Sequence, residues 1–163
     1  MSRAFVNVDQ AAAQASQPVE RLISEQPNYL TAQGLEQLKG RIDALERARS
    51  ALNGTGAEAD PQALADLERD LRYYRQRLQS AQPVPPATSR EQVQIGSWVT
   101  FADADDRRQR IQLVGEDEAD AGAGKINWGS PLGQALLGAK LGDERLWKRP
   151  MGDVLIEVIE VSP

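Results

Sequence analysis

The chain has 163 residues, of which 40% are hydrophobic and 26% charged, a composition typical of a globular protein with one ordinary domain or two small ones. It contains no Cys and no His, which excludes disulfides, a Ser-His-Asp triad and metal sites with Cys or His ligands. The formal net charge of −5 argues against broad nonspecific DNA binding as the main activity. No stretch is apolar for 18 residues and the first residues lack the pattern of a signal peptide, so we expect a cytoplasmic protein without a membrane span.

Residues 1–29 are rich in Ala, Gln and Ser and contain two prolines. Because this segment offers little apolar surface to bury, we predict a flexible tail. The alternative is that a short apolar piece such as Phe5-Val6 docks against the folded part.

Residues 30–82 carry two apolar heptad patterns, which predict an antiparallel helical hairpin. Thr31 and Asp60 are the expected N-caps, and Pro61 follows Asp60 at the first helical position. Each arm has about 20 residues, so the hairpin forms a finger about 30 Å long with its tip at 53–59. The two apolar seams consist of Leu35, Leu38, Ile42, Leu45 and Leu52 in the first arm and Leu64, Leu67, Leu71, Tyr74 and Leu78 in the second.

Residues 83–90 (PVPPATSR) predict a Pro-rich linker, and the hydrophobic period changes to near 2 in residues 91–163. The turn residues in 103–107 indicate a hairpin, and 130–138 predict a short helix with Ser130 as its N-cap and Pro131 at its first position. We therefore expect a small, mostly antiparallel sheet domain with one helix, and an α+β protein overall. Its predicted strands are 97–102, 109–114, 125–128, 144–148 and 154–161.

Three stretches of the C-terminal part, IQLVGEDEAD, NWGSPLGQALLGAKLGDE and GDVLIEVIEV, resemble the C-terminal domain of the bacterial GreA/GreB transcription elongation factors. YLTAQGLEQLKGRIDAL and RLQSAQPV are similar to the start and the end of the coiled coil in that family. The resemblance implies an N-terminal antiparallel coiled-coil hairpin followed by an FKBP-like antiparallel-sheet domain with one short helix.

The same resemblance implies a function. In this family the sheet domain docks at the rim of the RNA polymerase secondary channel, and the finger brings acidic residues to the catalytic magnesium of the polymerase, which then cleaves its backtracked transcript. Such a protein is an accessory factor rather than an enzyme. The expected partner is the RNA polymerase core, and we expect a monomer with no cofactor or metal of its own.

The finger tip departs from the family pattern. The family motif Asp-Leu-x-Glu-Asn-Ala-Glu does not occur, and each arm is shorter than in the family by about ten residues, or roughly 15 Å. Glu58 and Asp60 are the only acids near the tip and are the candidate contacts to the polymerase magnesium. The alternative is that Glu58 is a solvated loop charge and Asp60 a helix cap. We therefore expect a Gre-type regulator without strong stimulation of transcript cleavage; a cleavage-stimulating factor that uses these two acids is the alternative.

Two further groups are candidate contacts. By resemblance, the polymerase-binding residues are Ser130, Pro131, Leu132, Asp117 and Glu118. Clustered positive charge makes Arg72, Arg75 and Arg77 candidate contacts to nascent RNA. Each group has a plainer interpretation: a helix cap for the serine and proline, a solvated acidic loop for 116–120, and a solvated helix face for the arginines.

Two other classes of function stay open. FKBP-like topology suggests a peptidyl-prolyl isomerase, although a fold alone does not carry a function. The heptads also fit a plain coiled-coil adaptor, but a capped hairpin with a tight loop favours an intramolecular helix pair.

Overall fold

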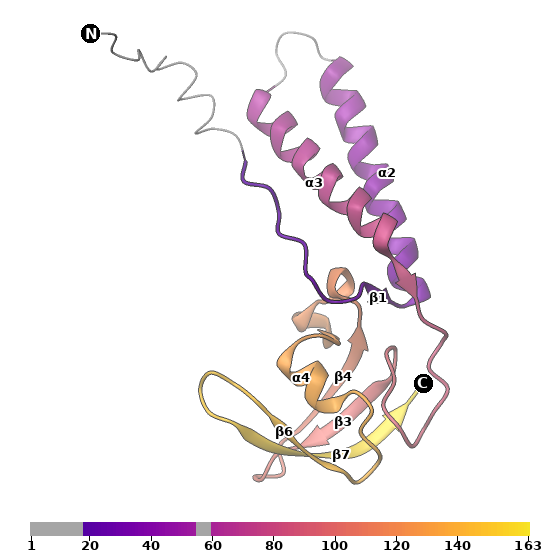
Figure 1. The fold of residues 1–163 in the computed structure, drawn as a ribbon, viewed down its shortest axis with the longest axis vertical. Helices are drawn as coiled ribbons and strands as arrows, with labels where there is room; N and C mark the ends of the chain where they lie inside the picture. The colour runs from indigo at the N-terminus through magenta and orange to yellow at the C-terminus, as the bar shows by residue number, and fades with distance from the viewer. Residues whose placement is uncertain (1–17, 55–59) are drawn as a thin grey trace, which may run out of the picture. The chain divides into compact units, whose positions relative to one another are not determined.

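The computed structural model describes residues 18–54 and 60–163 (Figure 1). The chain divides into two compact units. Within the described residues, the first unit comprises 18–24, 39–54 and 60–79, and the second comprises Glu25–Leu38 and Ser80–Pro163. This division differs from the predicted boundaries, because the tail end and the first turns of the finger belong to the sheet-containing unit.

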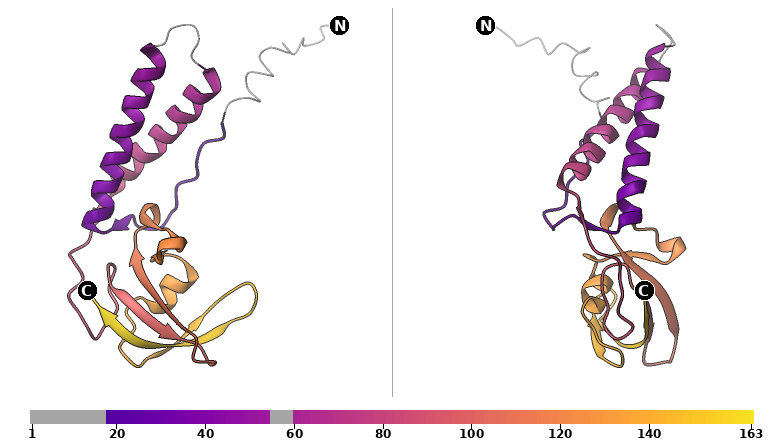
Figure 2. Two further views of the ribbon diagram at one scale, coloured as in Figure 1. Left: turned by 180° about the vertical axis from the view of Figure 1, so that it is seen from behind. Right: turned by 90° about the vertical axis from the view of Figure 1, so that its right-hand side faces the viewer.

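Two helices, α2 (Ala32–Gly54) and α3 (Pro61–Ser80), run antiparallel and confirm the predicted hairpin (Figures 1 and 2). Both begin where the sequence predicts. The Thr31 hydroxyl oxygen accepts a hydrogen bond from the backbone N–H of Gly34 at 3.0 Å, and an Asp60 carboxylate oxygen accepts one from the N–H of Gln62 at 3.0 Å. Each cap satisfies a first-turn donor that the helix itself leaves unpaired.

The apolar seams are deeply buried only in part of their length. Leu38 and Leu71 are 3% and 1% exposed, and Ile42 and Tyr74 are also buried. Leu52 and Leu64, nearer the loop, are only half-buried. A pair of helices without a third element cannot enclose its seam, so the loop end of the hairpin gains less from apolar burial.

The five-stranded sheet of the second unit has the order β5-β4-β3-β7-β6. Every strand boundary lies within one residue of its prediction. The strands are β3 (Trp98–Ala102), β4 (Arg108–Val114), β5 (Lys125–Asn127), β6 (Glu144–Trp147) and β7 (Val154–Ser162).

The sheet is mostly antiparallel, as predicted, and the exception is at one edge, where β5 pairs with β4 in parallel. Two short 3-10 turns, η2 (Glu116–Glu118) and η3 (Ala121–Ala123), separate these strands. They form a crossover instead of a hairpin, so β5 runs in the same direction as β4. The other pairs, β3 with β4, β3 with β7, and β6 with β7, are antiparallel, so the α+β class stands.

Helix α4 (Pro131–Leu136) packs against the sheet and completes a single apolar core. Leu136 from the helix and Leu113 from the sheet are fully buried. The core consists of Val93, Val99, Phe101, Ile111, Leu113, Leu132, Leu136, Ala139, Ile156, Val158 and Val161.

A two-residue parallel pair, β1 (Tyr29–Leu30) with β2 (Gln82–Pro83), was not predicted. The Gln82 N–H donates to the Asn28 carbonyl at 2.9 Å, and the Val84 N–H donates to the Leu30 carbonyl at 2.9 Å. The pair joins the chain before α2 to the chain after α3, so the predicted linker 83–90 begins inside a hydrogen-bonded ladder.

Candidate functional site

The turn before α4 is built from local hydrogen bonds. The Ser130 hydroxyl accepts from the N–H of Gly133 at 3.1 Å and donates to the carbonyl of Asn127 at 2.7 Å. The Asn127 side-chain oxygen accepts from the N–H of Gly129 at 2.9 Å, as expected of Asn in a turn. A Cβ on Gly133 would lie 2.3 Å from the Asn127 carbonyl oxygen, so only glycine fits there. The turn therefore holds Pro131 at the surface in a fixed position.

A groove of about 500 Å³, which we call the Pro131 groove, opens beside this turn. Pro131 and Met151 are exposed in its wall, Met151 to 94%, whereas Leu132 is buried beneath them. The groove is lined by Ala119, Ala121, Lys125, Ile126, Asn127, Ser130, Pro131, Leu132, Trp147, Lys148, Arg149, Pro150 and Met151. An exposed apolar surface of this kind is typical of a protein-binding site.

The far wall of the groove is the loop between β6 and β7. The Arg149 guanidinium lies 5.1 Å from the ring centre of Trp147, and its Nε donates to the carbonyl of Gly152 at 3.2 Å. These contacts anchor the loop that carries Met151. Together with Lys125 and Lys148, Arg149 gives the apolar groove a basic rim, which suits a partner with apolar side chains flanked by acids.

A second hollow of about 460 Å³ lies next to Pro131 and shares Pro131 and Lys148 with the groove. Leu146, which is 48% exposed, lines this hollow. Pro131 thus stands between two hollows with an exposed apolar residue in each, Met151 and Leu146.

The acidic run 116–120 is solvated only in part, because Asp120 is exposed whereas Glu118 is buried. Glu118 is 9% exposed, and its carboxylate accepts from the N–H of Thr31 at 3.0 Å, from the N–H of Gly115 at 2.9 Å and from the Thr31 hydroxyl. A carboxylate at the start of α2 also interacts favourably with the helix dipole. Glu118 therefore has a structural role, and neither it nor the half-buried Asp117 lines the Pro131 groove.

The three candidate arginines, Arg72, Arg75 and Arg77, do not form a free basic cluster. Arg72 pairs with Glu20 at 3.0 Å and Arg75 pairs with Glu46 at 2.9 Å. Arg77 is 2% exposed and makes interactions of its own. The prediction that its side chain lies on a solvated helix face is therefore wrong. A guanidinium buried to this extent does not offer its charge to a phosphate on the surface.

The candidate magnesium contacts at the finger tip stay a prediction. Asp60 is exposed and caps α3, and Glu58 lies outside the described residues. Within 18–54 and 60–163 there is no group of three or more acidic residues that could hold a metal ion. In the same ranges, the structure has no helix of the length and apolarity that crossing a membrane requires.

Comparison with known proteins identifies the family. Residues 87–163 match a family model described as transcription elongation factor, GreA/GreB, C-term. The transcription elongation factor GreA of Sphingopyxis alaskensis is 34% identical over 150 residues, covering 82% of this chain and 94% of that protein. The GreB of Neisseria meningitidis is 32% identical over 156 residues, covering 85% and 96%. A solved structure of GreA/GreB from Nitrosomonas europaea aligns at 25% identity with a TM-score of 0.42, covering 83% of this chain and 98% of that one. Since relatives above 30% identity are covered almost end to end, the chain belongs to the GreA/GreB family of transcription elongation factors.

Proposed function

We propose that this protein binds RNA polymerase at its secondary channel, with the Pro131 groove as the docking surface and the α2–α3 hairpin as the inserted finger. The observation that carries the docking assignment is the exposed apolar groove with a basic rim beside the Ser130 turn. Proteins seldom leave such a surface uncovered unless a partner binds it. The predicted contacts Ser130, Pro131 and Leu132 all line this groove.

We further propose that the protein regulates elongation without strongly stimulating transcript cleavage. The family tip motif is missing from the sequence, and the carboxylate of Asp60 already serves as a helix cap. The alignment with the Sphingopyxis relative has 150 positions but holds about 134 residues of this chain, which is 82% of 163, so about 16 positions lack a counterpart here. This deficit fits a shorter finger, whose carboxylates would not reach a magnesium ion that needs ligands at roughly 2.0–2.1 Å.

Docking is tested by measuring the affinity of core polymerase for single-residue variants. Met151→Ser and Leu146→Ser each remove an exposed apolar side chain beside Pro131, and we expect each to weaken binding roughly tenfold, or about 1.4 kcal/mol. The matched control is Leu141→Ser, because Leu141 is 50% exposed and lines neither hollow. Equal affinities for all four proteins would refute the docking assignment.

Cleavage is tested with a purified backtracked elongation complex at saturating protein. We expect little release of short 3′ RNA fragments, and competition with a cleavage-stimulating Gre factor. Asp60→Asn removes the charge but keeps the N-cap, because Asn caps as well as Asp, so this variant separates the two roles. Rapid cleavage that is lost in Asp60→Asn or Glu58→Gln would instead establish the cleavage-stimulating alternative.

A further inference from the structure

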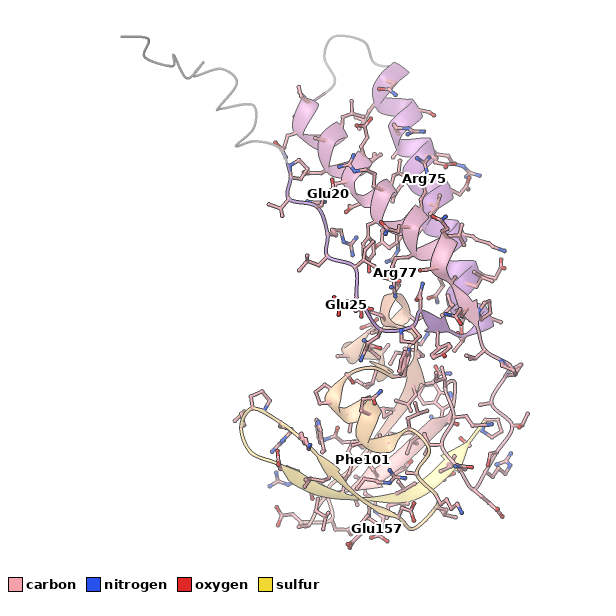
Figure 3. The ribbon with its side chains drawn as sticks, viewed as in Figure 1. Glu20, Glu25, Arg75, Arg77, Phe101 and Glu157 are labelled. Atoms are coloured by element: carbon pink, nitrogen blue, oxygen red, sulfur yellow. The ribbon has the colours of Figure 1, made fainter. Side chains whose placement is uncertain are left out.

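The chain before β1 makes specific contacts with the finger. Residues 18–24, which we call the strap, are extended and belong to the same compact unit as α3. This finding alters the predicted flexible tail 1–29, of which 1–17 lie outside the described residues. Glu20 is seen beside α3 in Figure 3.

Two charged residues of the strap bind side chains between positions 70 and 73 of α3. The Arg21 guanidinium lies 3.8 Å from the ring centre of Tyr73 and 3.4 Å from a carboxylate oxygen of Asp70. Glu20 pairs with Arg72. A cation stacked on an aromatic face and held by a carboxylate is the arrangement of a binding site for an arginine side chain.

The other side chains of the strap do not add an apolar anchor. Val19 is 87% exposed and Leu22 is 94% exposed. The strap is thus held mainly by surface charge pairs and one stacked guanidinium, interactions that individually contribute little and are weakened by salt. Such a segment is bound specifically but is readily displaced.

The strap also enlarges the finger. Its seven extended residues span roughly 24 Å, compared with about 30 Å for the 20 residues of α3. Its contacts fall at residues 70–73, along the middle of that helix. A chain that packs on a surface through its side chains adds roughly 10 Å to the thickness, by analogy with the spacing of stacked sheets. A finger that enters a confined channel with the strap in place is therefore wider than the hairpin alone.

We propose that the strap is an autoinhibitory cover of the finger. Glu20 and Arg21 hold it on α3 through Arg72, Asp70 and Tyr73, and these contacts must break before the finger enters the polymerase. The inference rests on the proposed function. It assigns to residues 18–24 a role in regulating access of the finger to its partner.

The position of the strap is measured directly by the distance between two spin labels. Because the chain has no Cys, the substitutions Val19→Cys and Gln76→Cys place labels at two exposed positions of the same unit without competing thiols. We expect a narrow distance distribution in the free protein and a broad one in Arg21→Ala or Glu20→Arg. Combining Glu20→Arg with Arg72→Glu restores the pair with reversed charges, so it should restore the narrow distribution. A broad distribution in the free parent would refute the cover.

The inhibitory effect is measured as affinity for core polymerase, using unlabelled full-length proteins. Arg21→Ala and Glu20→Arg should bind core polymerase roughly tenfold more tightly than the parent. In the parent, part of the binding free energy is spent on releasing the strap, and these variants do not have that cost. Arg107→Ala, which removes an exposed arginine from the 103–107 turn, should bind as the parent does.

The outcomes separate this inference from the proposed function. If the spin labels show an open strap in Arg21→Ala but this variant and the parent bind core polymerase with equal affinity, autoinhibition is overturned and polymerase binding stands. A narrow label distance that persists in the polymerase complex would overturn it as well. Absence of polymerase binding by every variant would overturn the proposed function, and the inhibitory role of the strap with it.

Discussion

The buried carboxylate of Glu118 allows a stringent test of how α2 begins. Glu118→Ala leaves the N–H groups of Thr31 and Gly115 without their acceptor. An unsatisfied buried donor costs about 1–3 kcal/mol, and Thr31 is only half-buried, so water replaces part of the loss there. We expect the free energy of unfolding of the sheet-containing unit to fall by about 2–4 kcal/mol.

Gly34 makes the prediction specific. A Cβ at this position would lie 2.0 Å from the carboxyl carbon of Glu118, so Gly34→Ala in the parent displaces the carboxylate and destabilises the protein. In the Glu118→Ala background the same change meets no carboxylate and gains the helix propensity of Ala over Gly, about 1 kcal/mol. The effect of Gly34→Ala on the free energy of unfolding should thus be destabilising in the parent and stabilising in the Glu118→Ala background.

Gly40 provides the control. It lies in the same helix, and a Cβ there would meet nothing within 4 Å. Gly40→Ala should therefore stabilise the protein by about 1 kcal/mol in both backgrounds. Denaturant unfolding is followed by tryptophan fluorescence, because the three tryptophans lie in the unit that contains Gly34 and Glu118. Circular dichroism is recorded as well, because Gly40 lies in the other unit and its effect is read from the helix signal. Equal effects of Gly34→Ala in both backgrounds would refute the assigned contact.

Three further predictions concern caps and one ion pair. Ser130→Ala should lower the unfolding free energy of the sheet-containing unit by about 1 kcal/mol in the same assay, since it removes the α4 cap. Asp60→Ala should lower helix stability by about 1 kcal/mol, measured by circular dichroism, whereas Asp60→Asn should be nearly neutral. The hydrogen bond from Arg72 lowers the pKa of Glu20 below its ordinary value of 4.5, so the contribution of this pair is present above pH 4.5 and lost as the pH falls through the lowered pKa. A spin label at position 19 should therefore become more mobile on acidification below that range, and Glu20→Gln should reduce the pH-dependent change.

The sequence predicted those features whose signals are local. The caps at Thr31, Asp60 and Ser130 depend on hydrogen bonds that span two or three residues, and all three are confirmed. The strands follow from patterns within three to nine residues, and their bounds agree with the prediction within one residue. The turn that holds Pro131 could therefore be predicted from residues 127–133 alone.

Features that depend on distant residues were missed. Glu118 and Thr31 are 87 residues apart in the chain, so nothing in the acidic run 116–120 indicates that one of its members is buried. The strap is a similar case, because Arg21 and Tyr73 are 52 residues apart and the composition of the tail around Arg21 favours disorder. Four of the thirteen residues that line the Pro131 groove come from the β6–β7 loop, where an exposed Met151 after Pro150 is the one signal available in the sequence.

The burial of Glu118 changes how variants of this surface must be interpreted. Glu118 was a candidate polymerase contact by resemblance, yet its carboxylate is directed at Thr31 and Gly115. A Glu118→Ala protein that binds polymerase poorly would be explained by the altered start of α2, because that helix is one arm of the finger. Only a variant such as Met151→Ser, whose side chain is 94% exposed and has no structural partner to lose, reports on the groove itself. A difference in affinity between these two variants is therefore meaningful only when their unfolding free energies have been measured as well.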